Sequence, residues 1–113
     1  MSADDKWLRP SVRLVREWMD AQDATVCAVA DALVVLVRRK GDRQVVTTLA
    51  TLARAAKCTP SEAMSALQLM HGVSLKNKHA SVGGLLGFVR FPPRKGVVCL
   101  SVVVGTGLAE RAK

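Results

Sequence analysis

Residues 52–72 read LARAAKCTPSEAMSALQLMHG, and the prediction of the fold starts there. At the centre is a capping box, in which Thr59 caps a helix, Pro60 takes its first position and Glu62 reaches back to the cap. Leucine and alanine recur at helical spacing on both sides of this box. Two short helices joined by a turn of three or four residues are therefore predicted, and this pair is the core of a helix–turn–helix.

Two further helices are predicted upstream, over residues 11–21 and 24–39. The second is apolar around most of its circumference, so we expect it to be buried on more than one side. Asp23 can cap its start and Gly41 can end it. A strand through residues 33–37 is the alternative, because β-branched side chains are dense there.

Strands are predicted on both sides of the helix–turn–helix. Residues 44–47 are β-branched and predict a brief strand before it. Residues 85–91 and 97–104 are two β-rich runs, and the five residues between them predict a hairpin loop. Residues 76–84 are expected to form a basic loop, and residues 105–113 a frayed end.

The order of these elements is helix, helix, short strand, helix, helix, hairpin. It predicts a single α+β domain over residues 1–113, in which residues 24–104 form a winged helix–turn–helix core. Residues 7–22 then supply an extra N-terminal helix.

The charge of +8 is unevenly distributed along the chain. Residues 1–35 carry four basic and six acidic side chains, whereas residues 36–113 carry thirteen basic and three acidic ones. This asymmetry indicates a face that binds a polyanion in the C-terminal two-thirds, against the alternative of a merely solvated basic surface.

The helix that begins after Thr59 carries polar residues that could contact DNA bases. Ser61, Ser65 and Gln68 project together at i, i+4 and i+7, and a glutamine amide can pair with adenine in the major groove. The alternative is that they are ordinary exposed polar residues. The cations predicted to contact phosphate are Arg54, Lys57, Lys76, Lys78, Arg90, Arg94 and Lys95.

Residues 45–104, with the run 52–72 and the hairpin that follows, resemble the winged helix–turn–helix of bacterial regulators of the MarR and ArsR kind. The resemblance implies a dimeric repressor or activator that binds double-stranded DNA, with the helix at 60–71 in the major groove and the hairpin as the wing. The chain departs from the pattern at Lys57, where the turn usually has glycine, and in a longer link over residues 73–84.

A homodimer would have to pair through the N-terminal helices, because no long helix is predicted after the wing. The candidates for its interface are Trp7, Val15, Trp18 and Met19. The alternative is that both tryptophans complete the core of one chain.

The sequence predicts neither an enzyme nor a cofactor. No phosphate-binding, dinucleotide-binding, nucleophile-elbow or zinc-protease string is present, and His71 and His79 have no metal-like spacing to the cysteines. The three cysteines are far apart, which is typical of a reduced chain in the cytoplasm, here expected at the nucleoid. The apolar run at 25–37 is too short to span a membrane and contains Asp31.

Two other functions are compatible with the sequence. A winged helix can serve as a protein-interaction module, for instance in an adaptor subunit or a small phage- or plasmid-encoded inhibitor, and the apolar Leu69 on the second helix would favour it. A basic chain can also bind RNA or bind DNA without sequence preference.

Overall fold

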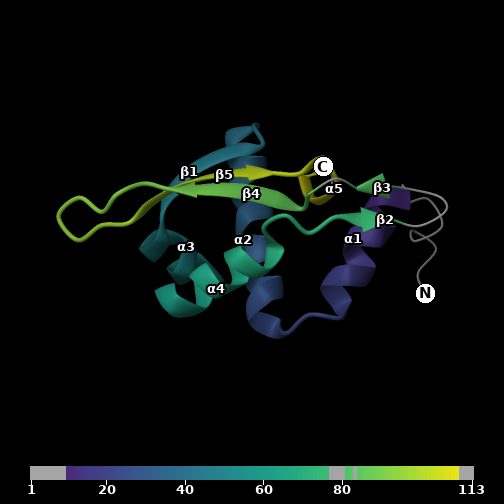
Figure 1. Ribbon diagram of the computed structural model, residues 1–113, viewed down its shortest axis with the longest axis horizontal. Helices are drawn as coiled ribbons and strands as arrows, with labels where there is room; N and C mark the ends of the chain where they lie inside the picture. The colour runs from purple at the N-terminus through teal and green to yellow at the C-terminus, as the bar shows by residue number, and fades with distance from the viewer. Residues whose placement is uncertain (1–9, 77–80, 83, 110–113) are drawn as a thin grey trace.

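The computed structural model describes residues 10–76, 81–82 and 84–109. Within them the chain is an α+β fold, as predicted, with five helices and a three-stranded antiparallel sheet, and it is compatible with a winged helix (Figure 1). The helices are α1 (Pro10–Asp20), α2 (Ala24–Lys40), α3 (Leu49–Ala56), α4 (Pro60–Met70) and α5 (Thr106–Ala109). The strands are β1 (Gln44–Thr48), β2 (Leu75–Lys76), β3 (Ser81–Val82), β4 (Leu86–Arg90) and β5 (Cys99–Val104).

Helix α2 is the central helix, and the alternative of a strand through residues 33–37 is wrong. The Asp23 side chain accepts a hydrogen bond from the Val26 amide at 2.9 Å, which satisfies one of the free donors at the helix start. Gly41 ends the helix in the left-handed region, with φ 71°. Although α2 runs for 17 residues, no helix in the described part of the chain is long and apolar enough to cross a bilayer.

The sheet has the strand order β1-β5-β4 and is antiparallel throughout. Side chains alternate between its faces, so Leu100, Val102 and Val104 of β5 all point to the helices and are fully buried. The opposite face, called the outer face below, is solvent-exposed, since Val46 and Val89 on the flanking strands are each 60% exposed.

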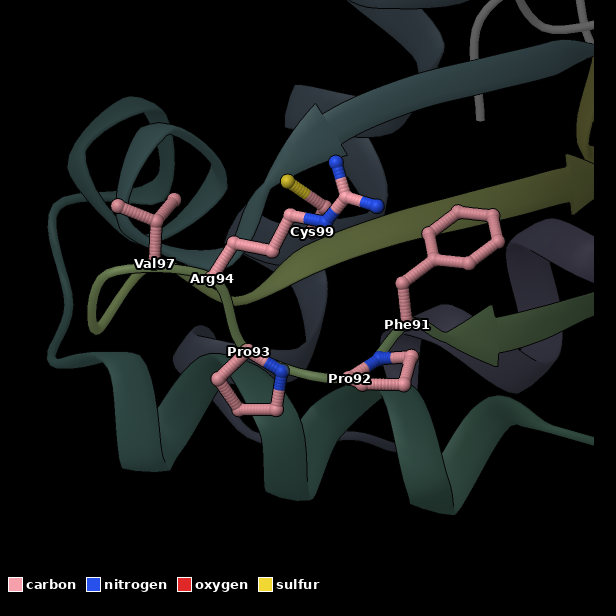
Figure 2. A pocket seen from close by; sticks show the side chains of 6 residues that line it. All are labelled: Phe91, Pro92, Pro93, Arg94, Val97 and Cys99. Atoms are coloured by element: carbon pink, nitrogen blue, oxygen red, sulfur yellow. The ribbon is translucent and has the colours of Figure 1, made fainter.

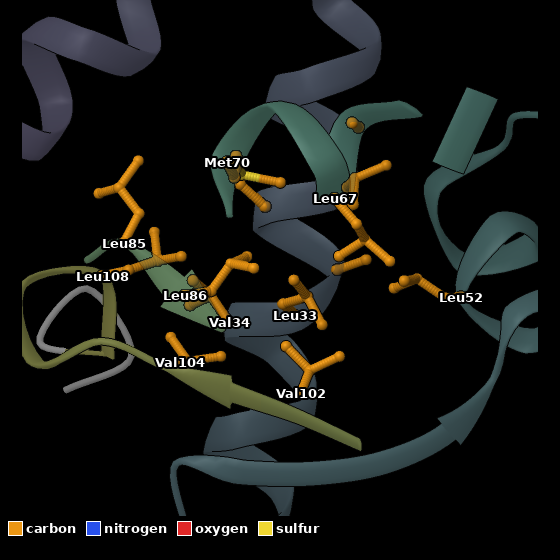
Figure 3. Close-up of a cluster of buried hydrophobic side chains, with 14 of the residues drawn as sticks. Leu33, Val34, Leu52, Leu67, Met70, Leu85, Leu86, Val102, Val104 and Leu108 are labelled. Atoms are coloured by element: carbon orange, nitrogen blue, oxygen red, sulfur yellow. The ribbon is translucent and has the colours of Figure 1, made fainter. Parts of the chain in front are cut away.

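One contiguous hydrophobic core joins the helices to the inner face of the sheet (Figure 3). Side chains from α2, α3, α4 and the sheet meet in it, and the larger ones with no exposed surface include Leu33, Leu52, Leu67, Met70 and Leu100. This core fixes α3 and α4 against the sheet and so sets the position of the turn between them.

Two regions differ from the sequence prediction. Residues 75–76 and 81–82 pair as a short antiparallel ladder, β2–β3, within the predicted basic loop. The predicted frayed end contains α5, in which Leu108 has no exposed surface. Leu108 belongs to the core, in the region where α5 lies against α1, so burial rather than local pattern orders these residues (Figure 3).

Candidate functional site

The turn between α3 and α4 is built around Lys57, which adopts the left-handed conformation with φ 57°. Its amide donates to the Arg54 carbonyl at 3.1 Å, and the Cys58 amide donates to the Ala53 carbonyl at 3.0 Å. Such a helix end usually takes glycine, because a Cβ costs energy in this region. The turn is therefore compact, although Lys57 stands where such turns usually have glycine.

The predicted capping box at the start of α4 is confirmed. The Thr59 hydroxyl accepts from the Glu62 amide at 3.1 Å, and the Glu62 carboxylate accepts from the Thr59 amide at 3.0 Å. Hydrogen bonding of the Glu62 carboxylate to Thr59, first to its backbone amide and then to its side chain, lowers the pKa of Glu62. The box fixes where α4 begins and hence which of its residues face outward.

Helix α4 separates its residues cleanly between two sides. Ala63, Ala66, Leu67 and Met70 are buried and are at most 2% exposed. Ser61, Ser65 and Gln68 are exposed, as the helical spacing predicts, and lie on the side opposite the buried residues. We call these three residues the outward face of α4. It is polar, uncharged and made of side chains that both donate and accept hydrogen bonds.

One flank of this outward face is acidic. A groove of about 280 Å³ runs between the start of α2 and α4, and its walls include Asp23, Glu62 and Leu69. Both carboxylates already accept a backbone hydrogen bond as helix caps. Ser61 and Ser65 of the outward face line the same groove, so these two acids border the outward face on its α2 side.

The predicted cations are only partly brought together. Arg54 and Lys57 lie at the α3–α4 turn, and Arg94 and Lys95 lie in the β4–β5 loop, which projects from the same end of the molecule (Figure 1). Arg90, at the end of β4, is also exposed. Lys76 lies in β2 at the opposite end, so the structure does not place it with the others. Lys78 is outside the described residues.

The tip of the β4–β5 loop is tighter than the five-residue loop predicted. Arg94 and Val97 exchange backbone hydrogen bonds of 3.1 and 2.9 Å, so only Lys95 and Gly96 form the turn. Both have positive φ, 52° and 76°, as a type I′ turn requires. This geometry puts a lysine at the extreme end of the projecting hairpin.

His71 ties the end of α4 to the hairpin. Its Nδ1 accepts a hydrogen bond from the Phe88 amide at 3.3 Å, and the two rings meet edge to face with centroids 5.1 Å apart. The Leu67 carbonyl accepts from the His71 amide at 2.9 Å, which continues the helix to this residue. His71 is therefore the helix-end residue that the sequence predicts, and it couples α4 to the strand that leads into the hairpin.

The candidate dimer residues of α1 are mostly internal. Val15 has no exposed surface and Met19 is 4% exposed, so both serve the core of this chain rather than an open surface. Trp18 is half-buried and packs against the same core. Trp7 is outside the described residues. The apolar stripe of α1 is directed inward because α2 and α5 lie against it.

Among the residues described, no three histidine, cysteine or acidic side chains could hold a metal ion together. Burial, with a smaller contribution from the Glu62 carboxylate, raises the pKa of the half-buried Cys58 thiol. A raised pKa keeps this sulfur protonated, which is the opposite of what a nucleophile needs.

Two features escaped the sequence interpretation. No aspartate or glutamate occurs between Glu62 and Glu110, although five lysines and arginines lie in that interval. The outer face of the sheet also collects exposed valines. Counting acids from the capping box onward would have revealed the first feature, whereas the second depends on strand pairing.

Comparison with known proteins gave no match: no family model, no curated protein and no solved structure matches this chain.

Proposed function

We propose that the protein is a winged helix–turn–helix transcriptional regulator that binds double-stranded DNA, with α4 in the major groove and the β4–β5 hairpin as the wing. The observation that carries the proposal is the composition of α4: an uncharged polar outward face follows the basic α3–α4 turn in the chain and precedes the basic hairpin, and the turn and the hairpin lie at the same end of the molecule. In such regulators base edges are read by polar side chains, and phosphates are held by surrounding cations.

The topology supports the same proposal. Helix α2, strand β1, helices α3 and α4 and the hairpin β4–β5 follow one another in the order of a winged helix, and β5 lies between β1 and β4. The cations assigned to phosphate are Arg54, Lys57, Arg90 and Lys95. Acidic side chains repel the phosphate backbone, and Asp23 and Glu62 border the outward face on its α2 side. The phosphates are therefore expected on the side of the α3–α4 turn and the hairpin.

Selection from a library of random duplexes tests the base-reading part of the proposal. We expect one sequence to be enriched and Gln68→Ala to weaken binding to it about 5- to 150-fold, equivalent to about 1–3 kcal/mol, with little effect on a scrambled duplex. Gln44→Ala is the matched control, because Gln44 is an exposed glutamine on β1, away from α4. Equal effects of both substitutions, or no enriched sequence, would contradict the proposal.

A protein partner at α4 is the second candidate function, and the observation that favours it is Leu69, which is 49% exposed beside the groove. Leu69→Ser separates the two functions, because it removes apolar surface without adding a charge that would repel phosphate. It should leave DNA affinity nearly unchanged if the helix reads bases through Gln68, whereas it should strongly weaken the docking of an apolar partner on α4.

A further inference from the structure

The outer face of the sheet is a second surface with a composition of its own. Strand pairing places Val46, Ser101 and Val89 in one row across the three strands. Val103 lies in the next row and is 46% exposed, and Phe91, 43% exposed, follows β4 opposite Cys99. Four large apolar side chains are therefore open to solvent on one side of a small sheet, and contiguous exposed apolar surface marks interaction sites.

No charged side chain belongs to this face. Its nine positions, taken from the register of the strands, are Gln44, Val46, Thr48, Gly87, Val89, Phe91, Cys99, Ser101 and Val103. Exposed antiparallel faces normally alternate apolar residues inside with polar or charged residues outside. A solvent-facing side of a sheet without any charge departs from that pattern.

At the hairpin end this face opens into a groove of about 550 Å³. Figure 2 shows that the side chains of Phe91, Arg94 and Cys99 point to the same side, while Pro92 and Pro93 lie on the backbone below them. Arg94 is the one charged residue that lines the groove. The apolar face is thus continuous, through Phe91 and Cys99, with a pocket that offers a guanidinium.

The charge around this groove indicates the chemistry of its occupant. Arg94 and Lys95 are present, and no acidic residue occurs in the sequence between Glu62 and Glu110 to neutralise them. A second copy packed with its strands parallel to these would bring the same cations to the same end, where they would repel. A carboxylate on an apolar segment would instead pair with Arg94, and such pairs are charge-assisted.

The size of the face also favours a short segment over a second copy. Three strands about 4.8 Å apart and about five residues long present a projected area of roughly 240 Å². The accessible surface of a patch exceeds its projected area, but a stable dimer buries about 800 Å² of accessible surface per partner, roughly three times this projected area. One extended peptide needs less area, and its alternate side chains can lie along the sheet.

We propose that the outer face and its groove form a docking site for an extended segment of a partner protein, apolar along its centre and acidic at the hairpin end. The valines contact the apolar side chains, and Arg94 binds a carboxylate of the segment. The valines of this site are on the opposite side of the sheet from the helices, whereas its groove lies on the β4–β5 hairpin, which the proposed function uses as the wing.

A displayed library of random 12-residue peptides, selected on the full chain, tests the proposal. We expect the enriched peptides to combine alternating apolar residues with aspartate or glutamate near one end. Binding of a synthesised winner should weaken at least ten-fold in Val46→Asp and in Val89→Asp, and about three-fold in Val89→Thr, which keeps a β-branched residue in the strand. Arg94→Glu should reverse the preference from acidic to basic peptides.

Leu69→Asp is the matched control, because Leu69 is similarly exposed but lies on α4. It should leave peptide binding unchanged, and Val46→Asp, on β1 outside the hairpin, should leave DNA binding unchanged, which separates this site from the proposed function. The proposal is overturned if no peptide is enriched, or if winners bind Val89→Asp as well as the native chain. It is also overturned if Lys57→Ala abolishes their binding, or if sedimentation shows a dimer that Val89→Asp dissociates, which would make the occupant a second copy.

Discussion

On α4, two neighbouring residues with similar side chains lie in opposite environments, one exposed to solvent and one buried in the core. Ser65 is exposed and Ala66, the next residue, is 2% exposed, yet the two side chains differ by one hydroxyl group. On the buried side, size matters, because α3 must approach closely. On the outward side, hydrogen-bonding capacity matters, because that side is free to meet a ligand. If α4 binds DNA as proposed, substitutions on its buried side should change the stability of the fold, whereas substitutions on its outward side should change binding.

The largest effect is expected on the buried side, at Leu67. Leu67→Ala removes a side chain with no exposed surface and leaves a cavity among the helices, so the free energy of unfolding should fall by about 3 kcal/mol. Urea denaturation followed by circular dichroism measures this loss. A loss below about 1 kcal/mol would mean that this side of α4 is not packed as described.

Ala63→Leu tests the same side from the opposite direction. Ala63 has no exposed surface, so three extra carbons must displace neighbouring groups and should cost about 2 kcal/mol. The matched control is Ser65→Leu on the outward side, where we expect the unfolding free energy to change by less than about 0.5 kcal/mol. Similar losses in the two variants would remove the distinction between the sides.

A smaller loss of stability is expected when the cap at the start of α4 is removed. Thr59→Ala removes the hydroxyl that accepts from the Glu62 amide and should lower the free energy of unfolding by about 1 kcal/mol. Thr59→Ser keeps that acceptor and should restore most of the stability. Equal melting of the alanine and serine variants would show that the hydroxyl contributes nothing.

The smallest effect is the pH dependence that Glu62 introduces. Because the pKa of Glu62 is lower in the folded chain than its usual value, its carboxylate stabilises the fold at neutral pH, and this stabilisation is lost as the pH falls through the folded pKa. Glu62→Gln should therefore differ most from the native chain near pH 7 and converge with it in acid. A side-chain titration by NMR that places Glu62 at or above its usual pKa would exclude this explanation.

The sequence predicted most of α2, β1, α3 and α4 because their signals are local. The Thr59 capping box, the Asp23 cap and the Gly41 stop each act within one turn of the helix that they bound. The outward residues of α4 followed from the same periodicity. Such features need no knowledge of what lies far along the chain.

What escaped prediction depends on distant contacts. Leu108 is buried in the core shared with α1, almost ninety residues away, and two-residue strands such as β2 are too short to show a period. Val15 and Met19 were predicted as interface residues, but contacts between α1 and distant parts of the chain bury them in the core. Lys76 was grouped with the other cations because the sequence did not show that β2 leads away from the hairpin.

The affinity for a duplex DNA of random sequence, measured by fluorescence anisotropy over a series of salt concentrations, tests the central claim most directly. If Arg54, Lys57, Arg90 and Lys95 each neutralise a phosphate, the logarithm of the association constant should fall against the logarithm of salt with a slope of about −4. Lys95→Ala should reduce that slope by about one. A folded protein that fails to bind duplex DNA at low salt, despite its charge of +8, would contradict the account.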